Sequence, residues 1–122
     1  MASNYAFVEY MGKGDFLGEF EIYVMLALVH LRHEAYGVKI RQEIERRTGR
    51  DAAIGAVYAT LARLEDKELV EHELSRPLPV QGGRARKYYT LTTAGERALN
   101  HSASMIARMM HGWRPRTEPR ST

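Results

Sequence analysis

The hydrophobic residues of segment 52–70, AAIGAVYATLARLEDKELV, recur at the period of an α-helix. They fall at positions i, i+3, i+4, i+7 and i+10, which are Ile54, Val57, Tyr58, Leu61 and Leu64. This spacing predicts a helix that packs one side on a core. The opposite side combines small and hydrogen-bonding side chains and holds no acidic residue before position 65; its members are Gly55, Ala56, Ala59, Thr60 and Arg63.

Two interpretations of this helix are open from its own pattern. It is either an ordinary amphipathic core helix or a helix whose free side approaches another molecule closely. Small side chains permit close approach to a DNA major groove, where Thr and Arg can bond base edges. The neighbouring segments decide between the two.

The preceding pattern predicts two helices. Segment 16–33 is apolar on nearly every side, which predicts a helix buried against several neighbours. Segment 36–47 places Tyr36, Ile40 and Ile44 on one stripe, and Gly49 is suited to end that helix in a left-handed turn. Two helices joined by a short glycine-containing turn, the second with a small-residue outer side, predict a helix-turn-helix.

The pattern after residue 68 changes to alternation of apolar and polar residues. Segments 69–74 and 86–91 are predicted strands, the second rich in aromatic and β-branched residues. Segment 75–85 between them holds two prolines and a Gly82-Gly83 pair, which predicts a loop. The three segments together predict an antiparallel β-hairpin.

A last helix is predicted to open at a capping box, Thr93-Ala94-Gly95-Glu96. Its apolar seam has spacings of four, three, four and three residues and consists of Leu99, Ala103, Ile106, Met110 and Trp113. A repeat of 3.5 residues is typical of a helix that pairs along its length with another helix. We therefore predict a dimer interface along this seam, with packing on the helix's own domain as the alternative.

These elements predict a mainly α fold with a small β-hairpin, a winged helix-turn-helix followed by a C-terminal dimerisation helix. The 122 residues fit one domain of modest core. We divide the chain into an N-terminal arm (1–15), a winged helix-turn-helix (16–93), a dimerisation helix (94–113) and a disordered tail (114–122).

Charge is unevenly distributed along the chain. The formal net charge is +3, and because residues 1–35 carry more acidic than basic side chains, the excess of cations lies in the rest. Segment 74–95 holds no acidic residue but four cations: Arg76, Arg84, Arg86 and Lys87. Such a concentration is expected where phosphates are neutralised, although a solvated surface loop is the alternative.

Composition argues against several other classes of protein. The chain has no cysteine, which excludes disulfides and thiolate metal sites. Its most apolar run is too short to cross a bilayer, for which about 20 apolar residues are needed, and no signal-peptide pattern opens the chain. We expect a cytoplasmic protein with no membrane partner.

No constellation of catalytic residues is evident. His30 and His33 stand at i, i+3, but no further ligands follow at metal-binding spacing, so we interpret them as packing or surface residues. No phosphate-binding glycine loop is present, and no spacing marks a catalytic triad. We expect no enzymatic activity, no metal and no cofactor.

The sequence resembles the PadR family of bacterial transcriptional regulators over residues 17–110, in the shorter branch with a single C-terminal helix. The residues that carry the resemblance are LALVHLRHEAYGVKI (26–40), IGAVYATLARLEDKELV (54–70) and GGRARKYYTLTTAGERAL (82–99). The resemblance implies a dimeric repressor whose third helix enters the major groove and whose wing contacts the DNA backbone or minor groove. Its partners would be double-stranded DNA, a second copy of the chain and, near Trp113 or the first helix, a small aromatic effector.

The resemblance also implies which residues bind DNA. The recognition-helix candidates are Gly55, Ala56, Tyr58, Ala59, Thr60 and Arg63, and the wing candidates are Arg84, Arg86 and Lys87. We expect the Tyr58 ring to be buried with its hydroxyl at a phosphate, and Arg63 and Thr60 to select the DNA sequence. Tyr88 and Tyr89 are expected to divide between core and surface.

The chain departs from the family pattern at two positions. Ala53 stands where Ser or Thr often caps the third helix, so that cap is absent unless Asp51 replaces it. Glu68 stands where the family usually has glycine, so the turn into the wing could differ. A winged-helix module that binds proteins and never DNA remains the alternative to a regulator.

Overall fold

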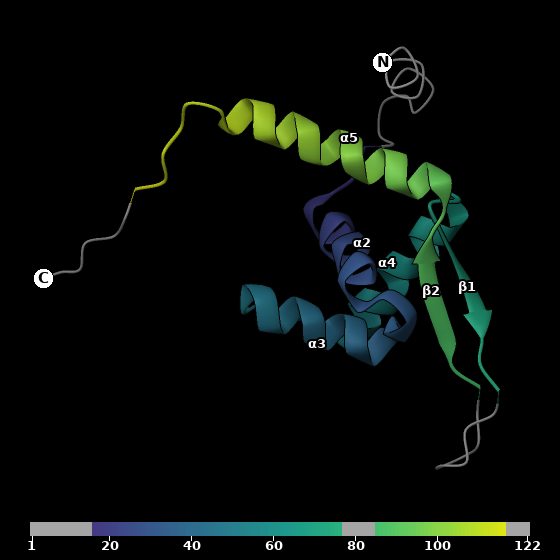
Figure 1. Ribbon diagram of the computed structural model, residues 1–122. Coiled ribbons are helices and arrows are strands. Elements are labelled where there is room, and N and C mark those ends of the chain that lie inside the picture. The colour runs from purple at the N-terminus through teal and green to yellow at the C-terminus, as the bar shows by residue number, and fades with distance from the viewer. Residues whose placement is uncertain (1–15, 77–84, 117–122) are drawn as a thin grey trace, which may run out of the picture.

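The computed structural model describes residues 16–76 and 85–116 (Figure 1). Three helices come first, a two-stranded hairpin follows, and a long helix closes the described chain. In order, the elements are α2 (Glu19–Leu31), the 3₁₀ turn η1 (Arg32–Glu34), α3 (Gly37–Thr48), α4 (Ile54–Asp66), β1 (Val70–Leu74), β2 (Lys87–Leu91) and α5 (Thr93–Met110). This order confirms the predicted winged helix-turn-helix with a C-terminal helix.

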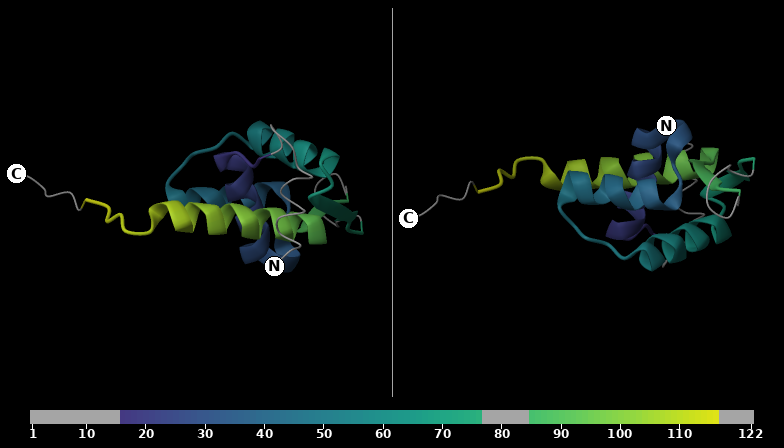
Figure 2. Two further views of the ribbon diagram at one scale, coloured as in Figure 1. Left: turned by 90° about the horizontal axis from the view of Figure 1, so that it is seen from above. Right: turned by 90° about the horizontal axis from the view of Figure 1, so that it is seen from below.

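Helix α2 lies at the centre of the core. It contacts α3, α4, β2 and α5, as its nearly all-apolar sequence predicts. Val24 and Met25 of α2 are fully buried, together with Ile40 of α3 and Leu61 of α4. Figures 1 and 2 show α3 and α5 on different sides of α2, with the C-terminal part of α5 running past the rest of the domain.

The turn between α3 and α4 forms as its sequence predicts. Gly49 has a φ of +78°, and its N–H donates to the Glu45 carbonyl at 2.8 Å, which ends α3. Helix α4 begins at Ile54 with Ala53 as its N-cap residue and no side-chain cap. Asp51 does not replace the missing cap, because its carboxylate lies 3.6 Å from Arg41 of α3 instead.

Strands β1 and β2 pair in antiparallel register, with Val70 opposite Leu91 and His72 opposite Tyr89. The Tyr89 N–H donates to the Ala35 carbonyl at 2.9 Å, which ties the hairpin to the segment before α3. The predicted alternation is correct at Val70 but wrong at Leu74, which is exposed at the loop end of the hairpin. Most of the predicted loop 75–85 lies outside the described residues.

The turn into the hairpin keeps a left-handed residue although glycine is absent. Glu68 has a φ of +62°. The Thr92 hydroxyl donates to the Glu68 carbonyl at 2.8 Å, and the Thr92 N–H donates to the Leu69 carbonyl at 3.0 Å. These bonds hold the turn against the start of α5.

Two expectations about α5 need correction. Its N-cap is Thr92, whose extended backbone lets its hydroxyl accept from the Gly95 N–H at 3.0 Å, so the predicted box at Thr93 is one residue late. The helix ends at Met110, with His111 as C-cap and Gly112 at a φ of +88°, so Trp113 lies beyond it.

The predicted tail (114–122) and N-terminal arm (1–15) lie almost wholly outside the described residues. Within the described ranges, no helix is both long enough and apolar enough to cross a bilayer.

Candidate nucleic-acid interface

The free side of α4 is lined by small residues. Val57, Leu61 and Leu64 are fully buried, as predicted. The exposed positions of small size are Gly55, Ala56, Ala59 and Ala62; we call these four the α4 small face. Ala62 was missed by sequence reasoning, although it stands three residues after Ala59 on the same side of the helix. Another molecule can therefore approach the α4 backbone closely here.

Three predicted positions on α4 are wrong in their burial. Thr60 was expected on the free side but is only 1% exposed. Tyr58 and Ile54 were expected in the buried stripe but are 46% and 38% exposed. The reason is that the buried side of α4 is centred nearer to Thr60 than the spacing predicts, so Ile54 and Tyr58, at its other border, stay partly exposed. Thr60 therefore lacks the exposure that reading bases requires.

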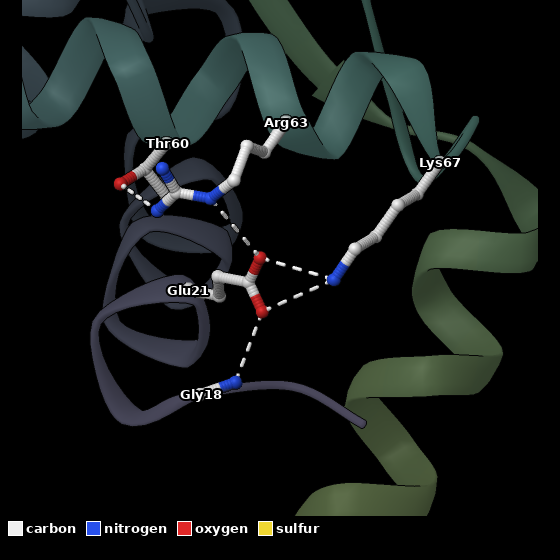
Figure 3. A network of polar contacts seen from close by, with 5 residues as sticks. All are labelled: Gly18, Glu21, Thr60, Arg63 and Lys67. Carbon is white, nitrogen blue, oxygen red and sulfur yellow. Dashed lines mark hydrogen bonds and ion pairs between the residues drawn. The ribbon is translucent and has the colours of Figure 1, made fainter. Parts of the chain in front are cut away.

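Arg63 is turned toward α2. One of its terminal nitrogens donates to the Thr60 hydroxyl at 3.1 Å, and its Nε lies 3.8 Å from a carboxylate oxygen of Glu21. Figure 3 shows Arg63 and Lys67 reaching from α4 toward the same carboxylate of α2, with Thr60 beside the Arg63 guanidinium. A base-reading role for Arg63 stays a prediction, and it would require the side chain to leave both partners.

Tyr58 rests on the first turn of α3. A Cβ atom at Gly37 would lie 2.3 Å from the Tyr58 hydroxyl oxygen, so the ring packs where only glycine leaves room. The first backbone N–H groups of a helix have no partner within the helix and favour anions. The Tyr58 hydroxyl and the N-terminus of α3 thus stand together beside the α4 small face.

Arg86, which directly precedes β2 at the loop end of the hairpin, forms a cluster with tyrosines. Its guanidinium carbon lies 3.9 Å from the centre of the Tyr36 ring, and the Tyr36 and Tyr88 rings meet edge to face at 5.6 Å. The Tyr88 hydroxyl, with smaller contributions from Tyr36 and Tyr58, raises the pKa of Arg86 above its ordinary value. Arg86 is therefore a permanent cation held in one position; we call Tyr36, Tyr58, Arg86 and Tyr88 the tyrosine–arginine cluster.

The remaining wing residues differ in their surroundings. Tyr89 is buried, and burial raises the pKa of its hydroxyl, whereas Tyr88 is partly exposed, which confirms the predicted division. Lys87 is exposed opposite Leu74. Arg84 lies outside the described residues. Strand β1 contributes exposed Glu71 and Glu73, so the cations of the wing concentrate on the β2 side.

The seam predicted on α5 divides into a buried and an exposed part. Leu99 is 7% exposed and packs in the core of its own chain. The rest of the seam is exposed, and two further methionines that the 3.5-residue spacing missed lie beside it. The exposed apolar residues at this end of the chain are Met105, Ile106, Met109, Met110 and Trp113; we call them the α5 apolar patch, and Ala103 adjoins it.

A groove separates the α5 apolar patch from the start of α2. Its volume is about 590 Å³, and its apolar lining includes Phe16, Leu17, Ile22, Met105 and Ile106. Among the described residues, no group of three His, Asp or Glu side chains could hold a metal ion. His30 and His33, which we interpret from the sequence as packing or surface residues, are both exposed.

These elements define the class of protein. A helix-turn-helix, a hairpin wing with a fixed cation and a small-residue recognition face form a winged helix-turn-helix of the DNA-binding kind. A family model described as "Transcriptional regulator PadR-like family" matches residues 25–101. The chain belongs to this family and is a DNA-binding regulator of transcription.

Solved structures of PadR proteins are similar to this chain. A PadR-like transcription factor from Bacteroides fragilis is 28% identical, with 75% of this chain and 84% of that chain covered and a TM-score of 0.61. A PadR family regulator from Clostridium difficile R20291 is 26% identical, with 74% and 94% covered and a TM-score of 0.57. A PadR family regulator from Eggerthella lenta DSM 2243 is 25% identical, with 92% and 93% covered and a TM-score of 0.58. No curated protein matched the chain.

Proposed function

We propose that this protein is a dimeric transcriptional repressor that binds an inverted-repeat operator in the cytoplasm and has no enzymatic activity. The observation that carries the proposal is the position of the tyrosine–arginine cluster beside the α4 small face. DNA recognition uses two kinds of contact. The cluster holds a cation for the first kind, and the neighbouring helix can approach bases closely for the second. Phosphate contacts set the position of the protein, and contacts to base edges select the sequence.

The α4 small face supports insertion into the major groove. Gly55, Ala56, Ala59 and Ala62 keep the helix backbone accessible, and alanine methyl groups can contact thymine methyl groups. No acidic side chain stands on α4 before Glu65, and Glu65 is engaged by His72 of β1. The first three turns of α4, about 11 residues, therefore present nothing that repels phosphates.

The tyrosine–arginine cluster supports a phosphate contact at the border of the small face. The Tyr58 hydroxyl can donate to a phosphate oxygen, and the N–H groups at the start of α3 can add to that contact. Arg86 supplies the positive charge, with Lys87 and Arg84 as further wing cations. Each phosphate neutralised by a cation makes the plot of log affinity against log salt concentration steeper by about 0.9.

The α5 apolar patch supports a homodimer. Five large apolar side chains are exposed together, among them Met109 at 84%. A patch of this kind on a helix that runs past its own domain is well suited to pack against the same helix of a second copy. Two α4 helices related by a two-fold axis would meet major grooves about 34 Å apart, hence the inverted repeat.

The groove beside Phe16 and Ile106 supports the proposed aromatic effector. Its apolar lining is of the kind that binds aromatic rings. A compound seated there would touch both α2 and α5, and so could shift the spacing of the subunits. The shift is measurable as a change in DNA affinity on titration with small aromatic compounds.

The test is a binding titration followed by fluorescence anisotropy at several salt concentrations. The wild-type protein first selects duplexes from a random library, and the selected duplex is compared with a scrambled one. We expect Arg86→Ala to weaken binding to both duplexes about tenfold and to reduce the salt slope by about one unit. Arg97→Ala, which removes an equal charge from the exposed side of α5, is the matched control and should change little.

Each outcome of the titration has a consequence. Salt-dependent binding that prefers the selected duplex supports a sequence-specific regulator. Equal losses in Arg86→Ala and Arg97→Ala would contradict the assigned role of the cluster. Absence of binding by the wild type, even at low salt, would favour the alternative, a winged-helix module that binds proteins.

A further inference from the structure

A carboxylate in the first turn of α2 is buried and bound on three sides. The Glu21 side chain is 10% exposed. One of its oxygens accepts from the Gly18 N–H at 2.9 Å, and Lys67 Nζ lies 3.2 Å from the other. The Nε of Arg63 lies 3.8 Å from that same second oxygen (Figure 3). The charge therefore joins the start of α2 to the end of α4, 46 residues away in sequence.

These contacts constrain α4 in a way that its apolar contacts do not. Val57, Leu61 and Leu64 hold α4 on the core, but the hydrophobic effect is non-directional and adds no specific partner for the side chains at the border of the helix. The Glu21 carboxylate is buried, and a buried carboxylate without partners is costly, so the orientation of α4 that brings Lys67 and Arg63 to it is favoured. Arg63 and Lys67 are one turn apart on α4, so Glu21 opposes both rotation and sliding of this helix.

We propose that Glu21 is a positioning residue for DNA binding, which fixes the rotation of α4 and holds Arg63 beside α2. The inference rests on the proposed function, because it assumes that α4 reads DNA. The α4 small face is exposed and adjoins the border of α4 from which Arg63 and Lys67 reach Glu21. A change in rotation would move its residues relative to the base edges while the phosphate contacts at the wing remain.

This role predicts a loss of selectivity rather than a general loss of affinity. Phosphate contacts from Arg86 and Lys87, which stand on the hairpin, do not depend on the rotation of α4. Contacts to base edges do depend on it, since a bidentate or methyl contact fails when displaced by about 1 Å. Arg63, once released from Glu21, is free to reach any nearby phosphate, which favours binding to all sequences alike.

The experiment compares Glu21→Gln with Glu19→Gln. The glutamine at position 21 can still accept from Gly18 and keeps the volume, but it loses the charge that binds Arg63 and Lys67. Glu19 stands on the same turn, is exposed, and its substitution changes the net charge equally. The measured quantity is the ratio of affinities for the selected and the scrambled duplex.

We expect this ratio to fall about tenfold in Glu21→Gln and to stay within about twofold of wild type in Glu19→Gln. Affinity for the scrambled duplex should be unchanged or higher in Glu21→Gln. A folded Glu21→Gln protein with the wild-type ratio would overturn the inference. So would an equal fall of both affinities, which indicates loss of active protein.

A second variant covers the case in which Glu21→Gln does not fold, as judged by circular dichroism. Lys67→Met keeps the aliphatic stem at the end of α4 and removes the charge. Its ratio should fall at least threefold, and a wild-type ratio in this variant overturns the inference. Failure of the proposed function appears separately, because the wild-type protein itself would then show no preference between the two duplexes.

Discussion

In the turn between α4 and the hairpin, Glu68 adopts a backbone conformation that is unfavourable for a non-glycine residue. Its φ of +62° is in the left-handed region, where a non-glycine residue is disfavoured by about 1–2 kcal/mol. We expect Glu68→Gly to raise the free energy of unfolding by about 0.5–1 kcal/mol, since glycine relieves the strain but gains entropy in the unfolded chain. Urea denaturation measures the change. Glu68→Ala, which retains a Cβ, is the control, and an equal gain in that variant would contradict the explanation.

Gly37 is required by a neighbour rather than by its own backbone. A methyl group at this position would collide with the Tyr58 ring. We expect Gly37→Ala to lower the free energy of unfolding by about 1–3 kcal/mol, the usual cost of overpacking, and to weaken DNA binding by displacing Tyr58. In a Tyr58→Ala background the sign should reverse, because alanine then only improves helix propensity, by up to about 1 kcal/mol. Destabilisation in both backgrounds would show that Tyr58 is not the cause.

At the scale of elements, α3 carries a titratable group that links its stability to pH. Glu43 is buried, and bonds from Arg47 and then Arg46 hold the pKa of its carboxyl below the ordinary value of 4.5. Its folded pKa is thus lower than its unfolded pKa. The stabilisation is complete above about pH 4.5 and is lost as the pH falls through the lower, folded value.

This linkage predicts a difference between two melting curves. We expect the melting temperature of the wild type to fall more steeply below pH 4.5 than that of Glu43→Gln, which has no proton to take up at this position. The wild type should be the more stable protein at pH 7. Thermal melts from pH 7 to pH 3 measure both trends, and parallel curves would contradict the assignment to Glu43.

At the scale of the whole molecule, the chain exposes an apolar surface that a second copy would cover. We expect the wild type to have twice the mass of one chain in light scattering, and Ile106→Glu in the α5 apolar patch to shift it to the monomer. Leu74→Glu changes a residue that is equally apolar and 64% exposed, but on the hairpin, and should stay dimeric. A monomeric wild type, or a dimeric Ile106→Glu protein, would remove the support for an α5 interface.

Much of this architecture was predictable because it depends on local chemistry. Apolar spacing distinguishes helix from strand, and Gly49 ends α3 because few other residues adopt its backbone conformation. The buried residues of α2 followed from its lack of a polar side. The position of the tyrosine–arginine cluster was only half predicted: Arg86 was expected on the wing, but its contact with Tyr36, 50 residues earlier, follows from the fold.

The tertiary structure alone decided which border of the α4 stripe is covered. Tyr58 and Thr60 stand at opposite edges of the apolar stripe of α4. The 3.6-residue period of the helix is compatible with α2 covering either edge. In the fold it covers Thr60, leaves Tyr58 open and brings Arg63 and Lys67 to Glu21. Periodicity determines that a helix has a buried side, because that depends only on the helix's own geometry. The direction in which that side points depends on the packing of every neighbour at once, which no local pattern contains.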